Sequence, residues 1–197
     1  MSESKVLSSE ALVIDDFVLD KNLLYCLKHK EEFCPECGAD FADVNLIGRA
    51  FRANKGFLPP PNPAVLKQVG ELKHQGNELF KQKKYEQAIE AYTQAINASR
   101  SRPVWDPPQL VSEEVTVLLS NRAACFLERD FFVNALYDAE IVTRIRPTWP
   151  KGHFRKGRAL YGLGRYGEAV DSFDRACALD PESKDVRHHL EMALAKA

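Results

Sequence analysis

The chain has 197 residues, with 27 Lys and Arg against 28 Asp and Glu, and 45% of its residues are hydrophobic. This length suffices for one substantial domain and a smaller one. A net charge of −1 argues against a generally basic nucleic-acid binder and against a polyacidic tail. No apolar run approaches the roughly 20 residues that cross a bilayer, and the first ten residues do not resemble a signal peptide. We therefore expect a soluble protein that faces the cytosol or nucleus.

The first 60 residues are slightly acidic, with 7 Lys and Arg against 10 Asp and Glu. Short apolar runs rich in β-branched residues occur at 11–14, 17–19 and 23–25 and indicate strands or a hairpin. A fourth apolar run, at 44–47, is too short for its periodicity to distinguish a helix from a strand. We expect a small α+β or irregular N-terminal segment.

Three of the five cysteines lie close together in this segment, and with one histidine they follow the pattern C-x2-H-x4-C-x2-C. The four residues are Cys26, His29, Cys34 and Cys37. Clustered thiols in a reducing compartment point to metal more than to disulfides, and an S₃N set suits tetrahedral zinc. Gly38, directly after the Cys34/Cys37 pair, suits a turn that aims these two thiols at one ion. Free thiols and redox chemistry stay open as alternatives. The two remaining cysteines, Cys125 and Cys177, fit helix packing.

A proline-rich stretch at 58–63 separates the N-terminal segment from the rest of the chain. Prolines remove backbone donors and cannot continue a helix or a central strand, so the stretch indicates a stiff connector. We place a domain boundary there. The predicted domains are 1–60, a partner-binding segment with the Cys/His cluster, and 61–197.

Downstream of the connector, small and aromatic residues recur in register. The aligned sets are Gly76, Ala123 and Gly157; Ala88, Ala135 and Ala169; and Tyr92, Ala139 and Phe173. Pro147 and Pro181 close the second and third units 34 residues apart. Units of this length resemble the helix–turn–helix tetratricopeptide repeat (TPR). We therefore predict an all-α solenoid of three repeats with a capping helix at 182–197. The first unit is 13 residues longer, and we expect its extra residues to form a loop within 99–108.

The first helix of each unit lines the concave face of such a stack, and five polar residues fall on these helices. They are Lys73, Asn77, Asn121, Lys151 and Arg155. Singly, each could be an ordinary surface residue. As a set, they resemble the dicarboxylate clamp of chaperone-binding TPR proteins, whose five positions carry these same residue types.

The resemblance implies a peptide ligand that ends in Asp, as the Glu-Glu-Val-Asp tails of heat-shock 70 and 90 chaperones do. Cationic groups would supply charged hydrogen bonds and the amides would orient the carboxylates. In the clamp family, Lys73, Asn77 and Asn121 would hold the terminal carboxylate, Lys151 the Asp side chain, and Arg155 the preceding peptide. Two aromatic residues, Phe80 and Phe154, are candidate groove walls, with ordinary helix packing as the alternative.

Residues 57–197 also resemble the cytosolic TPR subunits of fungal Sec complexes, which serve post-translational import into the endoplasmic reticulum. The Pro-Asn connector and the Arg-Pro-x-Trp stretch at 102–105 carry this resemblance. It implies a non-enzymatic adaptor, peripheral on the cytosolic face of the membrane, that docks heat-shock 70 beside other Sec subunits. No catalytic motif is visible in the sequence. A co-chaperone free of any translocon, or a zinc-dependent module that uses the repeats as a recruiter, stays open.

Overall fold

A computed structural model describes residues 12–14, 17–20, 23–26, 28–37, 39–55, 57 and 59–197. The first ten residues, Ala11, Gly38 and Leu58, on which some of the predictions above fall, lie outside the described residues. The described residues form an N-terminal unit and a helical unit, which are treated in turn. The predicted division of the chain at the connector stays a prediction.

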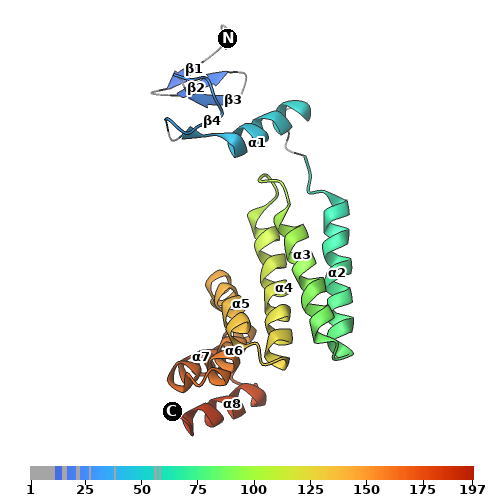
Figure 1. The fold of residues 1–197 in the computed structure, drawn as a ribbon, viewed down its shortest axis with the longest axis vertical. Helices are drawn as coiled ribbons and strands as arrows, with labels where there is room; N and C mark the ends of the chain where they lie inside the picture. Colours follow the sequence, from blue (N-terminus) through green and yellow to red (C-terminus); the bar gives the residue numbers. More distant parts are fainter. Residues whose placement is uncertain are drawn as a thin grey trace. The chain divides into compact units, whose positions relative to one another are not determined.

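The N-terminal unit contains two small antiparallel sheets and one helix (Figure 1). Strands β1 (Leu12–Ile14), β2 (Phe17–Asp20) and β3 (Leu23–Cys26) pair in chain order, which confirms the predicted strands. Strands β4 (Phe33–Cys34) and β5 (Ala39–Asp40) form a second pair. Helix α1 (Ala42–Ala53) contains the undetermined run at 44–47.

A buried asparagine joins helix α1 to the sheet. The side chain of Asn45 accepts a hydrogen bond from the backbone nitrogen of Leu24, at 2.5 Å, and donates one to the carbonyl of Leu24, at 2.6 Å. One carboxamide thus satisfies both backbone groups of a β3 residue. This polar contact ties the buried face of α1 to the sheet.

The helical unit contains three helical hairpins followed by a single helix (Figure 1). A proline stands in the first turn of α2, α4 and α6, the first helix of each hairpin, where its missing N–H has no intrahelical partner to lose. The helices are α2 (Pro63–Lys81), α3 (Tyr85–Arg100), α4 (Pro108–Glu128), α5 (Phe132–Ile145), α6 (Pro150–Gly162), α7 (Tyr166–Leu179) and α8 (Lys184–Leu194). The predicted repeats and capping helix are confirmed.

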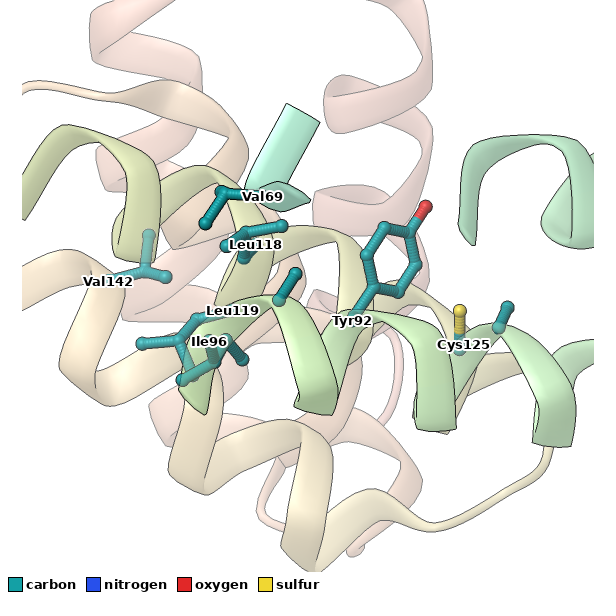
Figure 2. Close-up of a cluster of buried hydrophobic side chains, with 9 residues drawn as sticks. Val69, Tyr92, Ile96, Leu118, Leu119, Cys125 and Val142 are labelled. Atoms are coloured by element: carbon teal, nitrogen blue, oxygen red, sulfur yellow. The ribbon is translucent and has the colours of Figure 1, made fainter. Parts of the chain in front are cut away.

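Each hairpin is closed by the recurring small and aromatic residues. A Cβ atom placed on Gly76 would lie 2.6 Å from the ring of Tyr92, and one on Gly157 would lie 2.6 Å from the ring of Phe173. Only glycine permits this approach, since carbon atoms in contact stand about 3.5–4.0 Å apart. Figure 2 shows Tyr92 beside the aliphatic core, with its hydroxyl pointing away from Leu118 and Val69.

The extra residues of the first hairpin form a shorter loop than predicted. Helix α3 continues to Arg100 and helix α4 already begins at Pro108, so much of the insertion lengthens the two helices. The side chain of Arg102 donates two hydrogen bonds to Glu114, at 2.8 and 2.9 Å, and Ser99 donates to the same carboxylate at 2.9 Å. These contacts fix the start of the loop against α4. Across the described ranges, no helix is long and apolar enough to cross a membrane.

Candidate peptide-binding site

All five residues of the predicted clamp lie on the first helices of the three hairpins. Lys73 and Asn77 are on α2, Asn121 is on α4, and Lys151 and Arg155 are on α6. Helix α4 contacts both α2 and α6. The repeat geometry therefore brings residues that are far apart in the sequence onto three neighbouring helices.

Asn77, Asn121 and Arg155 line a common cavity of about 320 Å³. The amide nitrogen of Asn121 donates a hydrogen bond to the side-chain oxygen of Asn77 at 3.2 Å. Both asparagines are half-buried. The full lining is His74, Asn77, Glu78, Phe80, Lys81, Tyr92, Asn121, Ala124 and Arg155.

Arg155 is a half-buried cation in the lining of this cavity. Burial lowers the pKa of its guanidinium to about 10, so the group is still protonated at neutral pH. It donates a hydrogen bond to the hydroxyl of Ser120. Within the described part of the chain, its guanidinium forms no ion pair with a carboxylate, whereas those of Arg122 and Arg158 do. A desolvated guanidinium without an anionic partner favours binding of an anion.

The two clamp lysines are exposed and are not part of the cavity lining. Lys73 lies one turn before Asn77, and Lys151 lies one turn before Arg155. Neither lysine forms an ion pair with any other described residue, whereas Lys67, Lys81 and Lys156 do. Both ammonium groups are therefore available to a ligand.

The two predicted wall residues have different surroundings. Phe80 lines the cavity and packs edge-on against Tyr85, with ring centroids 5.5 Å apart. Phe154 lies against Phe173 and His189, at 5.9 and 5.1 Å, and is not part of the cavity lining. For Phe154, helix packing is the contact present.

Sequence reasoning missed three charged or titratable residues of the lining. His74, Glu78 and Lys81 share a face of α2 with Asn77, at the i, i+3, i+4 and i+7 spacing that could have identified them. A hydrogen bond from Lys81, at 2.7 Å, lowers the pKa of Glu78. Glu78 and Lys81 thus place one negative and one positive charge at the same rim of the cavity.

The Cys/His cluster of the N-terminal unit comes together as its spacing predicts. One ligand atom from each of Cys26, His29, Cys34 and Cys37 lies within 4.8 Å of all the others. The His29 Nδ1 atom is 3.1 Å from the sulfur of Cys34 and 3.4 Å from that of Cys37. Three sulfurs and one imidazole nitrogen at this separation could hold a metal ion.

Local structure supports the position of each group in the cluster. Cys26 ends β3, and Cys34 ends β4 just before the turn that carries Cys37. The other imidazole nitrogen of His29 is 3.0 Å from a carboxylate oxygen of Glu36, which leaves Nδ1 to face the sulfurs. Burial alone would raise the pKa of Cys26, but hydrogen bonds with the backbone of Glu31 and His29 bring it down to about 6.

Two stretches of the chain, residues 74–102 and 150–183, match the profile of the tetratricopeptide repeat. The chain is similar to the ER protein translocation subcomplex subunit sec67 of Schizosaccharomyces pombe, with 40% identity over 57% of this chain and 62% of that protein. It is also 38% identical to the heat shock protein STI1 of Saccharomyces cerevisiae, over 61% of this chain and 18% of that protein. The chain thus spans less than two thirds of either relative.

Among solved structures, the second TPR domain of human RPAP3 in complex with the HSP70 peptide SGPTIEEVD is similar, with 28% identity and a TM-score of 0.56. The alignment covers 66% of this chain and 98% of that domain. Both repeat matches fall on the helical unit. The three helical hairpins and these matches identify the helical unit as a stack of tetratricopeptide repeats.

Proposed function

We propose that the chain is a non-enzymatic adaptor whose cavity binds the carboxyl-terminal Glu-Glu-Val-Asp tail of a heat-shock chaperone. The observation that carries the proposal is the half-buried Arg155 guanidinium, which shares one cavity with the amides of Asn77 and Asn121. The exposed ammonium groups of Lys73 and Lys151 stand one turn away on the same helices. Such a site suits a ligand with two carboxylates close together.

A chain that ends in Asp presents its terminal carboxylate and its side-chain carboxylate a few bonds apart. Asn77, Asn121 and Lys73 would hold the terminal group, and Lys151 the side chain. Arg155 would contact the peptide that precedes the last residue. Amides donate in fixed directions while ammonium groups act as mobile charges, so this division gives both orientation and attraction.

Two relatives support this proposal. The similar human RPAP3 domain binds a peptide with the sequence SGPTIEEVD, which ends in Glu-Glu-Val-Asp. STI1 of Saccharomyces cerevisiae is named as a heat shock protein.

Calorimetry with a peptide ending in Glu-Glu-Val-Asp tests the proposal, with Lys73→Ala as the clamp variant. Lys67→Ala is a matched control, since Lys67 lies on the same helix and already pairs with Glu71 at 3.7 Å. We expect Lys73→Ala to weaken binding by about 1.5–3 kcal/mol, the range for a lost charged hydrogen bond. Equal affinities of the two variants would contradict the clamp.

The similarity to sec67 extends the proposal to the location of the adaptor. We infer that the chain docks a heat-shock 70 chaperone beside a Sec translocation complex on the cytosolic face of the endoplasmic reticulum, held by another Sec subunit. The N-terminal unit and the outer surface of the repeats are the candidate contacts with that subunit. Affinity purification from fungal microsomes should recover Sec subunits. Their absence from the eluate would favour a co-chaperone not attached to a translocon.

For the Cys/His cluster we propose a structural zinc ion held by Cys26, His29, Cys34 and Cys37. The close approach of the four ligand atoms and the Glu36 contact on His29 support it, because a carboxylate that holds the second nitrogen orients a ligating imidazole. A bound zinc would tie two turns of a small unit together. Metal analysis of the purified protein should find zinc in a 1:1 ratio. Metal-free, fully folded protein would instead support the free-thiol interpretation.

A further inference from the structure

The tyrosine that closes the first hairpin carries a hydroxyl that packing does not require. The ring of Tyr92 lies over Gly76, and in the third hairpin the ring of Phe173 lies over Gly157 at the same 2.6 Å approach. Both rings are buried. Phenylalanine therefore fills this position equally well, and burial of an extra hydroxyl costs free energy unless the hydroxyl is hydrogen-bonded.

The hydroxyl of Tyr92 is bonded to one of the clamp asparagines. It donates to the side-chain oxygen of Asn77 at 2.7 Å, and the amide nitrogen of Asn121 donates to the same oxygen at 3.2 Å. Two donors thus occupy the two lone pairs of that oxygen. Among the hydrogen bonds of the described residues, none uses the amide nitrogen of Asn77.

This arrangement gives the Asn77 carboxamide one orientation. If the Asn77 carboxamide rotated by half a turn, its NH₂ group would face the donor nitrogen of Asn121. The Asn77 oxygen would then stand where its unbonded amide nitrogen stands now. An oxygen there would repel a carboxylate. Burial raises the pKa of Tyr92 to about 12, so its hydroxyl keeps its proton, and hence its donor role, throughout the neutral range.

We propose that Tyr92 is a positioning residue of the peptide site: its hydroxyl holds the oxygen of Asn77, so that the amide nitrogen of Asn77 is presented to the peptide carboxylate. The inference deepens the proposed function and rests on it. Tyr92 acts through Asn77, so its hydroxyl matters only while the Asn77 amide is present.

A double-mutant cycle by peptide titration tests this role. The variants are Tyr92→Phe, Asn77→Ala and their combination, titrated with a free-acid peptide ending in Glu-Glu-Val-Asp. NMR titration at high peptide concentration follows the weaker variants. Tyr161→Phe is the matched control, because it removes the hydroxyl of a tyrosine on α6 that is not part of the cavity lining. Thermal unfolding of every variant reports on folding separately.

We expect Tyr92→Phe to weaken binding by about 3–10-fold, the equivalent of one net hydrogen bond, and to leave the unfolding temperature close to that of the wild type. In the Asn77→Ala background the same change should have almost no effect. Tyr161→Phe should bind as the wild type does.

Other outcomes would overturn the inference. Unchanged affinity of Tyr92→Phe would show that the hydroxyl does not position the amide. An equal loss in both backgrounds would assign the hydroxyl to the peptide or to general packing. Both results require a wild-type chain that binds the tail, so they leave the proposed function intact. A wild-type chain that does not bind would overturn that function, and this inference with it.

Discussion

The close packing of the first hairpin can be tested by replacing each of two glycines on helix α2 with alanine in turn. A Cβ atom on Gly76 would lie 2.6 Å from the Cε1 atom of Tyr92, whereas one on Gly70 would meet no atom within 4 Å. Both positions are inside the same helix. Gly70→Ala and Gly76→Ala therefore gain the same helix propensity and differ in the overlap with Tyr92.

The magnitudes follow from these two terms. Alanine is favoured over glycine in a helix interior by about 1 kcal/mol, so Gly70→Ala should stabilise the helical unit by about 0.5–1 kcal/mol. Overpacking of a well-filled core costs about 1–3 kcal/mol. The propensity gain cancels between the variants, so Gly76→Ala should be less stable than Gly70→Ala by about 1–3 kcal/mol.

Denaturation in guanidinium chloride, followed by the helical circular dichroism signal, measures this difference. Tail affinity adds a second readout, because a displaced Tyr92 ring would carry its hydroxyl away from Asn77. We expect Gly76→Ala to bind the tail more weakly and Gly70→Ala to bind normally. Equal stability of the two variants would refute the close approach of Gly76 to the Tyr92 ring.

Three further changes test other parts of the structure. Asp138, buried on α5, accepts two hydrogen bonds from Arg122 at 2.8 Å, so Asp138→Ala should cost about 3–5 kcal/mol of unfolding free energy. A loss under about 1 kcal/mol, the range of exposed pairs, would contradict a buried ion pair. Arg155→Ala should weaken tail binding by about 1.5–3 kcal/mol in calorimetry, and unchanged affinity would remove Arg155 from the clamp. Cys34→Ser should lower the zinc content seen by native mass spectrometry while Cys177→Ser retains it, and equal zinc in both would refute the proposed ligand set.

The repeats could be predicted from the sequence because their packing rule is local. A glycine or alanine on the first helix must face an aromatic or small residue on the second, and this relation recurs at a fixed period. Gly76 with Tyr92 and Gly157 with Phe173 follow it in the structure. The first-hairpin loop lies at 101–107, inside the predicted stretch, but the sequence did not indicate that the remaining extra residues lengthen α3 and α4.

Helix α1 was not predicted, because the apolar run at 44–47 is too short to show a period and the contact with the sheet is made by a polar side chain. The decisive side chain is Asn45, a polar residue inside a short apolar run, and its partner is the backbone of Leu24. The sequence pattern does not indicate that Asn45 bonds to the backbone of Leu24.

In the candidate site, the motif identified the five clamp positions but not their environment. The partial burial of Arg155 and the bond from Tyr92 to Asn77 depend on how α3 and α4 pack against α2 and how α6 packs against α4. Phe154 was a candidate wall from its place beside the motif, yet its ring packs towards α7 and α8.

The central claim is that the cavity recognises a terminal carboxylate, and calorimetry with two forms of one tail peptide tests it most directly. The peptides would share the Glu-Glu-Val-Asp ending and differ only in a free or amidated carboxyl terminus. Amidation removes the charge that Asn77, Asn121 and Lys73 are proposed to hold. We predict strong binding of the free acid and at least about tenfold weaker binding of the amide, as expected for a lost charged hydrogen bond. Equal affinity for the two peptides would contradict the proposed function.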